Sequence, residues 1–229
     1  MSKPASFKYL DIVAAFFVSI LVISNIASSA KIVDVGITLF AIPLAFDGGT
    51  LLFPFVYVLG DVLTEVYGFR TARRVIFTGF AVMVLAALVF FVLGILPSEA
   101  SWEEATGGNT VFYAILGGMS YGGIVLASLA AYLAGELSNS LVLSRLKVIM
   151  KGRLLFVRTI GSTLVGEMLD SLIFILIACA AGVFPWEIFW SLAVTNYILK
   201  CAIEAVVTPF TYWASGFLKR KEGIDVYDA

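Results

Sequence analysis

Long apolar segments recur from one end of the chain to the other, and most approach the length of a membrane-crossing helix. Of the 229 residues, 61% are hydrophobic and 14% are charged, and the mean hydropathy is +1.01. A soluble globular domain has about 25% charged residues. A helix needs roughly 20 apolar residues to cross a hydrocarbon core about 30 Å thick. The chain therefore predicts an all-α integral membrane protein of about six spans, with a single transmembrane domain over residues 1–229.

Prolines, glycines and charged residues mark the ends of the apolar segments. We expect the first segment to stay as a span and not to be a signal peptide, because about twenty residues exceed the usual length of a signal core. Residues 35–46, which contain Pro43, are too short to cross, and we expect a re-entrant or interfacial segment there. The residues after the last span are polar, and we expect them to be mobile. The expected spans are residues 10–30, 51–67, 75–96, 110–137, 156–182 and 187–217.

Basic residues alternate with these spans in a regular way. Thirteen of the fifteen Lys and Arg residues fall on one side of the membrane. They are Lys3, Lys8, Arg70, Arg73, Arg74, Arg145, Lys147, Lys151, Arg153, Arg158, Lys219, Arg220 and Lys221. The positive-inside rule makes that side cytoplasmic, with both termini inside. We expect a multi-pass protein of the cell inner membrane, whose basic clusters are topology signals and not a nucleic-acid surface.

Missing residue types and motifs exclude several classes of protein. The sequence has no histidine, which removes Ser/His and Cys/His nucleophile pairs and the HExxH zinc helix. Cys179 and Cys201 stand singly in apolar segments, as packing residues do. No P-loop is present, so this chain does not itself hydrolyse ATP. We expect no enzymatic activity, no metal and no cofactor.

Ionisable side chains inside a span are costly, so those that occur are candidates for function. They are Asp61, Glu65, Glu136, Glu167, Asp170, Lys200 and Glu204, accompanied by the amides Asn139 and Asn196. Residues 196, 200 and 204 share one helix face because they recur every four positions. We expect an ion pair between Lys200 and Glu204. Alternatively, this pair, together with Glu167 or Asp170, is an interhelical clamp that fixes packing and binds no solute.

A purely structural explanation stays open for the carboxylates of the second and fourth spans. Asp61 and Glu65 share one helix face with Tyr57. The arginines at positions 70, 73 and 74 follow one to two turns later and can neutralise both carboxylates at the membrane interface. Glu136 can likewise pair with the basic residues at positions 145 and 147.

Two short motifs in different spans resemble each other. Gly60-Asp61-Val62-Leu63-Thr64 is similar to Gly166-Glu167-Met168-Leu169-Asp170, and the two spans are expected to run in opposite directions. A 3+3 inverted repeat would produce this similarity and would bring both acidic motifs to one site. Such a pocket, suited to a flat, nitrogen-rich solute, would be bounded by Asp61, Glu167, Asp170 and Asn196, with Tyr57, Phe174, Tyr197 and Trp213 as aromatic neighbours.

The run FPFVYVLGDVLTEVYGFRTARR resembles the queuosine precursor transporters, also called the vitamin uptake transporter family. Similar stretches extend along nearly the whole chain: Ser24-Asn25-Ile26, GELSNS from Gly135, KGRLLFVRTIGSTLVGEMLDSLIF from Lys151, and the pattern Lys200, Glu204 and Thr208-Pro209. The resemblance implies six membrane helices and import of 7-cyano-7-deazaguanine or 7-aminomethyl-7-deazaguanine. Some relatives carry other residues around positions 136 and 139, so these two have weaker support as ligands.

The resemblance also guides the choice of site residues. A guanine-like ring presents a ring N–H beside an exocyclic amine, and one carboxylate can accept both. We therefore expect Glu167 or Asp170 to hold the base, in a site between the first, second, fifth and sixth spans. The other expected substrate-binding residues are Asp61, Asn196, Lys200, Tyr57 and Asn25, and the expected supporting or gating residues are Glu65, Glu204 and Arg70.

The expected activity is facilitated or ion-coupled uptake of a small deazapurine. We expect the protein to lie in the lipid bilayer and to bind no nucleic acid. A homodimer is compatible with the sequence. One alternative is the substrate-binding S-component of an ATP-driven vitamin uptake complex. Another is an intramembrane aspartyl protease, because Leu59-Gly60-Asp61 is similar to part of a GxGD motif. Val58 stands where that motif has glycine, and the chain shows no partner aspartate motif.

Overall fold

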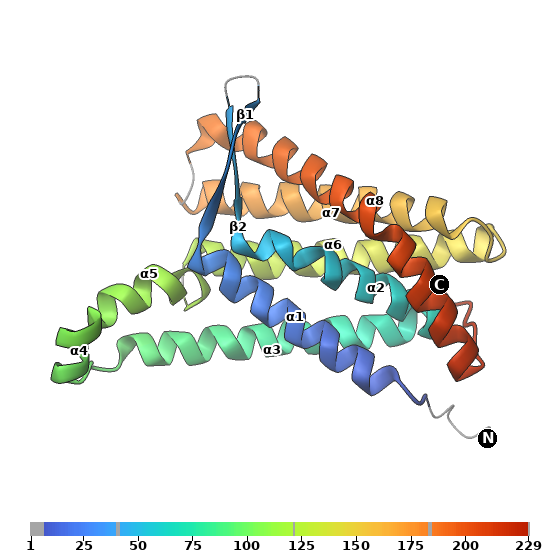
Figure 1. The fold of residues 1–229 in the computed structure, drawn as a ribbon, viewed down its shortest axis with the longest axis horizontal. Helices are drawn as coiled ribbons and strands as arrows, with labels where there is room; N and C mark the ends of the chain where they lie inside the picture. The colour runs from blue at the N-terminus through green and yellow to red at the C-terminus, as the bar shows by residue number, and fades with distance from the viewer. Residues whose placement is uncertain (1–6, 40–41, 121, 183–184, 229) are drawn as a thin grey trace.

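Long helices make up most of the chain in the computed structural model, which describes residues 7–39, 42–120, 122–182 and 185–228 (Figure 1). They are α1 (Leu10–Ala30), α2 (Phe53–Tyr67), α3 (Phe69–Ile95), α4 (Ala100–Thr106), α5 (Gly108–Ser120), α6 (Gly123–Ile149), α7 (Leu155–Ala180) and α8 (Phe189–Glu222). Five are long and apolar enough to cross a membrane: α1, α3, α6, α7, and α8 from Leu192 onwards. The prediction of a helical membrane protein is confirmed.

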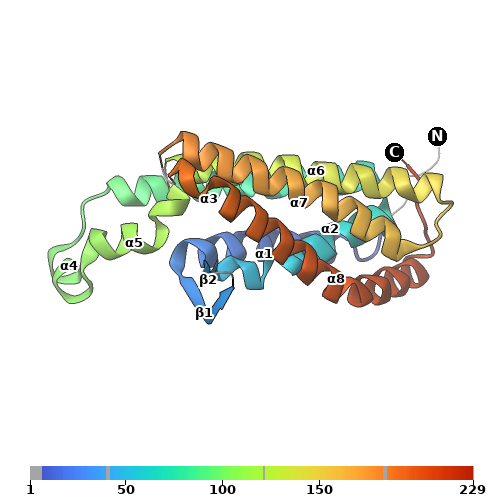
Figure 2. The same cartoon turned by 90° about the horizontal axis from the view of Figure 1, so that it is seen from above.

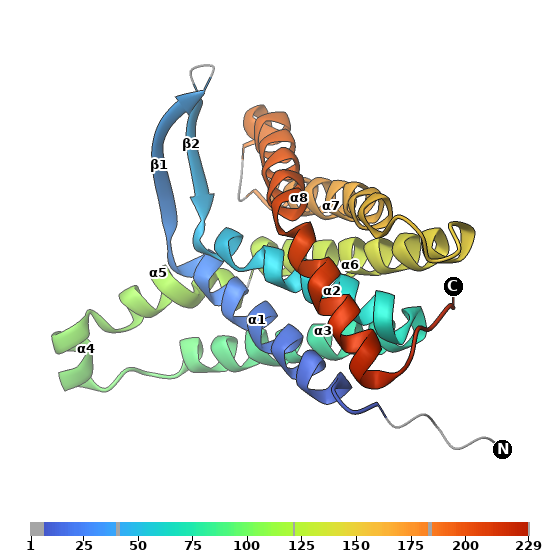
Figure 3. The same cartoon turned by 45° about the vertical axis from the view of Figure 1, so that its right-hand side comes forward.

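The short helix α2 lies at the centre of the bundle. It packs against α1, α3, α6 and α8, and Figures 1 and 3 show these helices around it. From Val56 to Tyr67, Leu59 is the one residue that is not fully buried. Gly68, at a positive φ of 84°, then turns the chain directly into α3. The expected third span thus begins earlier, at Phe69, and the three arginines lie on α3 and not between two spans.

The segment between α1 and α2 is a β-hairpin. Strands β1 (Ile32–Leu39) and β2 (Ile42–Asp47) run antiparallel, with Ile32 opposite Asp47 and Leu39 opposite Ile42. The hairpin projects from the helices in Figures 1 and 3. Residues 35–46 add no membrane-crossing helix, as expected, although residues 40 and 41 lie outside the described part. The hairpin itself was not predicted; β-branched residues in β1 favour it over a helix.

The expected single span over residues 110–137 is wrong. The structure has two helices there, α5 and α6, and Gly122 at the start of α6 has a positive φ of 90°. Glycine adopts this backbone conformation without steric cost, so the glycine-rich stretch ends one helix and starts another. Helix α6 then continues to Ile149, and Arg145 and Lys147 lie within it and not in a loop.

Helices α6 and α7 lie side by side along their length (Figure 2) and approach closely at two glycines. A Cβ atom on Gly135 would lie 2.9 Å from the Cβ of Asp170, and one on Gly166 would lie 2.8 Å from the Cβ of Asn139. Real carbon atoms do not approach so closely, so each position needs glycine. Small residues bring membrane helices together in this way. This close packing holds Glu167 and Asp170 of α7 against the segment of α6 that contains Glu136, Asn139 and Ser140.

The end of α8 and the residues after it, up to residue 228, form hydrogen bonds with the rest of the fold, whereas a mobile end was expected. The carboxylate of Glu222 accepts hydrogen bonds from two backbone N–H groups before α1, at 2.7 and 2.9 Å, and from the Tyr67 hydroxyl at 2.9 Å. Asp228 accepts from two backbone N–H groups at the start of α3, at 2.6 and 3.1 Å. Carboxylates at these positions satisfy free donors and complement the helix dipoles.

Replacing Gly166 with alanine tests the α6–α7 packing. The new Cβ would lie 2.8 Å from Asn139 Cβ and 3.0 Å from the Gly135 carbonyl. Overpacking of this kind costs about 1–3 kcal/mol, so we expect a lower melting temperature in detergent. Gly161→Ala is the matched control on the same helix, because its Cβ would meet only a Leu146 methyl at 3.4 Å. Equal melting temperatures for the two variants would contradict the close approach.

Candidate functional site

Lys200 of α8 joins two carboxylates of α7. Its ammonium lies 3.2 Å from Oε2 of Glu167 and forms a hydrogen-bonded ion pair with Asp170. The expected Lys200–Glu204 pair is therefore wrong, whereas the link from Lys200 to Glu167 and Asp170 of the facing helix, one part of the alternative clamp, is present. The physical reason is that two carboxylates on the facing helix offer the ammonium more negative charge than one carboxylate on its own helix.

A small cavity opens beside this ion pair. It is lined by Phe53, Pro54 and Tyr57 of α2, Glu167 of α7, and Lys200, Ile203 and Glu204 of α8. The Lys200 ammonium also lies 5.2 Å from the centre of the Phe53 ring, a cation–π distance. The Tyr57 hydroxyl faces the Glu167 carboxylate. The cavity has room for roughly one water molecule, so no aromatic ring fits it in this conformation.

The structure thus brings together four of the predicted site residues, Tyr57, Glu167, Lys200 and Glu204, with Asp170 joined through the ion pair. Five others do not line the cavity; Asp61 and Glu65 are described below with their own contacts. Asn25 donates to the Leu21 carbonyl within α1, at 2.9 Å, and α1 contributes no lining residue. Asn196 is half-buried one turn before Lys200, and Arg70 is exposed at the start of α3. Of the predicted aromatic neighbours, Trp213 is 61% exposed and faces outward.

Behind the cavity, α2 and α6 share a buried polar layer. The Asn139 amide donates to Asp61 at 2.8 Å, and the Thr64 hydroxyl donates to the Ser140 hydroxyl at 3.0 Å. Asp61 is fully buried in this layer and does not line the cavity. Glu136 is also buried, and its Oε2 lies against Gly60 of α2. A Cβ atom added to Gly60 would lie 2.9 Å from that oxygen.

Sequence reasoning missed several residues of this region. Phe53 stands four positions before Tyr57, and Ile203 stands three after Lys200, so helix periodicity from known site residues could have found both. Glu136 and Asn139, both in the GELSNS run, are not among the predicted site residues, yet they lie in this region. Their signal was the same one that identified the others, an ionisable or amide side chain within an apolar helix.

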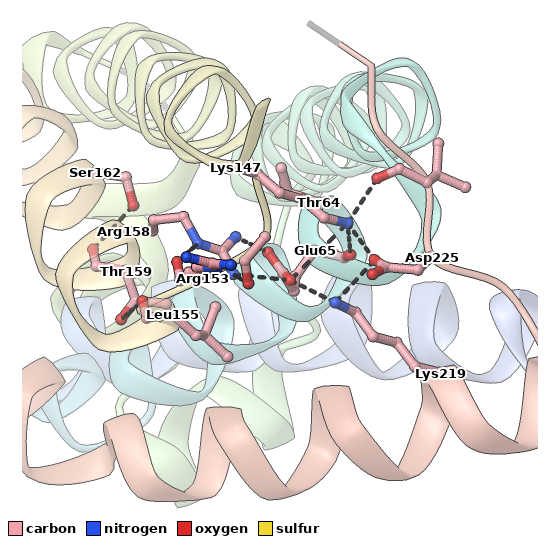
Figure 4. A network of polar contacts seen from close by, with 12 residues as sticks. Thr64, Glu65, Lys147, Arg153, Leu155, Arg158, Thr159, Ser162, Lys219 and Asp225 are labelled. Atoms are coloured by element: carbon pink, nitrogen blue, oxygen red, sulfur yellow. Dashed lines mark hydrogen bonds and ion pairs between the residues drawn. The ribbon is translucent and has the colours of Figure 1, made fainter. Parts of the chain in front are cut away.

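Glu65 lies away from the cavity, in a second network at the end of the bundle (Figure 4). The Arg158 guanidinium of α7 donates to both of its carboxylate oxygens, and Lys219 of α8 donates at 2.5 Å. The Lys147 ammonium donates to the Glu65 backbone carbonyl at 2.6 Å. The expected neutralisation by Arg70, Arg73 and Arg74 is wrong, because those side chains are exposed on α3.

The carboxyl-terminal segment completes this network. Asp225 accepts from Lys147 at 2.5 Å and lies 2.8 Å from Lys219, and the Val226 carbonyl accepts from Lys147 at 2.6 Å. Partial burial opposes ionisation of Asp225, but the hydrogen bonds from Lys147 and Lys219 hold its pKa below the usual value. Lys147 and Arg158, which the sequence placed among the topology signals, are therefore buried partners of acidic groups.

Known proteins similar to this chain are transporters. Residues 47–214 match the family model described as "Putative vitamin uptake transporter". The "Probable queuosine precursor transporter" of Bacillus subtilis is 27% identical over 175 residues, covering 76% of this chain and 73% of the relative. That of Haemophilus influenzae is 30% identical over 164 residues, covering 69% and 63%. The "Queuosine precursor transporter" of Escherichia coli is 28% identical over 197 residues, covering 84% and 82%. No solved structure gives a significant match.

Replacing Glu65 with glutamine tests the role of the second network. The change leaves the buried Arg158 guanidinium without an anion, and breaking a buried ion pair in this way costs about 3–5 kcal/mol. We expect a large loss of folded yield and a lower melting temperature in detergent. Arg74→Gln, which removes an exposed charge, is the control and should change neither. If both variants melt like the unmodified protein, the network does not hold the fold together.

Proposed function

Because the chain belongs to the vitamin uptake transporter family, we propose that it is a membrane transporter, not an enzyme, that imports a queuosine precursor. The substrate would be a 7-deazaguanine, either the 7-cyano or the 7-aminomethyl base. The printed names of three bacterial relatives support this class of substrate. The structural observation that carries the proposal is the cavity where Glu167, Lys200 and two aromatic residues meet.

Each edge of a deazaguanine would find a complementary group in this cavity. The ring N–H and the exocyclic amine would donate to Glu167 or Asp170, the acceptors already used by Lys200. The ring carbonyl oxygen would accept from the Lys200 ammonium. The flat ring would lie against Phe53 and Tyr57, whose faces favour aromatic stacking.

The small size of the cavity implies that binding accompanies a movement of α8 against α7. In the closed state, Lys200 occupies the carboxylates that the base would use. A base that donates to Glu167 replaces part of this ion pair, so it would favour an opened arrangement of the two helices. A ligand shifts a conformational equilibrium only through such a difference in contacts. We propose that exchange of the lysine for the base at these carboxylates accompanies transport.

Uptake of both deazaguanines by a queuosine-deficient cell that expresses this chain tests the proposal, with Glu167→Gln and Asp170→Asn alongside. Hydrogen bonds to charged groups contribute about 1.5–3 kcal/mol, so we expect at least one variant to lose about tenfold or more in apparent affinity. The control is Glu103→Gln, which changes an exposed acid on α4. Unchanged uptake by both folded cavity variants would contradict the assignment of Glu167 and Asp170.

A measurement with the purified protein separates a carrier from an S-component. If the chain acts alone, liposomes that contain it will take up the base without ATP or any other protein. Binding of the base without uptake would instead indicate a substrate-binding subunit that needs an energising module.

A further inference from the structure

Among the described residues, two buried carboxyl groups near the cavity have no hydrogen-bond partner. Both carboxylate oxygens of Glu136 and both of Glu204 are buried and lack any hydrogen bond within the described residues. Neither group forms an ion pair in that part of the chain. The one ammonium nearby, that of Lys200, is already engaged by Glu167 and Asp170.

The surroundings of Glu136 are predominantly acidic. The carboxylates that face it are Asp61 of α2, Glu167 and Asp170 of α7, and Glu204 of α8, and the phenols of Tyr57 and Tyr132 also lie near. Asp61 has one oxygen bonded to Asn139, and its other oxygen has no hydrogen-bond partner in the structure described. Five carboxyl groups thus share one interior region, where Lys200 pairs with Glu167 and Asp170 and the charge of Arg158 acts on Asp61.

An ionised carboxylate in a protein interior costs several kcal/mol unless a cation or hydrogen-bond donors compensate its charge. In the part of the chain that the structure describes, Glu136 and Glu204 have neither a paired cation nor a hydrogen-bond donor. A metal ion would need three or more ligands around one point, and the acidic residues of the described segments form no such arrangement. A proton needs only one carboxyl oxygen, and it removes the charge that the surroundings do not compensate.

We propose that Glu136 and Glu204 form a proton-binding site and that uptake of the base is coupled to inward movement of a proton. This inference rests on the proposed transport function. A carboxylate binds a proton from the outer solution when the site is open outward, and the O–H bond breaks when the site opens to the cytoplasm. Glu204 lines the cavity, and Glu136 lies against Gly60, three positions along α2 from the lining residue Tyr57, so the proton site borders the substrate site.

Purified protein in liposomes tests the coupling, with labelled 7-cyano-7-deazaguanine as the probe. An acidic outside solution should drive accumulation above equilibrium, up to about tenfold for each pH unit if one proton accompanies each base. We expect Glu136→Gln to retain binding and base-for-base exchange but to lose accumulation driven by the pH gradient. Glu204→Gln is the second variant, in case the first does not fold; because Glu204 lines the cavity, only its response to the pH gradient is scored and not its affinity. Glu103→Gln is the exposed control.

The outcomes separate the coupling from the transport function. Wild-type uptake that equilibrates without responding to the pH gradient would overturn the proton site while leaving transport in place. Accumulation that follows a sodium gradient, and disappears when choline replaces sodium, would also overturn it. Gradient-driven accumulation by folded Glu136→Gln and Glu204→Gln would show that neither carries the proton. If the wild type neither binds nor transports either base, the proposed function fails, and the coupling fails with it.

Discussion

The pairing of buried charges within the protein is the constraint on which this structure depends. Helix α2 carries two carboxylates, Asp61 and Glu65, that are buried out of contact with water. Glu65 is compensated by Arg158 of α7 and Lys219 of α8, and Asp61 by the Asn139 amide of α6. Each partner comes from a different surrounding helix. The position of α2 at the centre is therefore the arrangement in which its carboxylates can be satisfied.

Much of the helical architecture followed from the apolar segments. The first expected span and α1 have the same bounds, and the fifth differs from α7 by one residue at the start and two at the end. The β-hairpin and the division between α5 and α6 were not predicted. A run of β-branched residues and a glycine-rich stretch are each compatible with more than one local structure, and the neighbouring helices decide between them.

For the site, the sequence predicts which residues are candidates but not how their charges pair. The apolar setting of Tyr57, Glu167, Lys200 and Glu204 marked them as candidates, and the structure places all four at one cavity. Which charges pair could not be predicted, because pairing depends on distances between helices. Basic residues near the ends of spans also look alike in sequence, whether they are exposed topology signals such as Arg74 or buried partners such as Lys147.

The distances along the chain between Glu65 and its partners have a consequence for synthesis. Arg158 follows it by 93 residues and Lys219 by 154. When α2 leaves the ribosome, its carboxylates therefore have no compensating charges, and each acidic residue at the centre of a span costs about 2.5–3.5 kcal/mol on insertion. A helix of fifteen residues cannot offset that cost alone. Helix α2 is therefore made early, but the charges that compensate Glu65 become available only once α7 and α8 have been made.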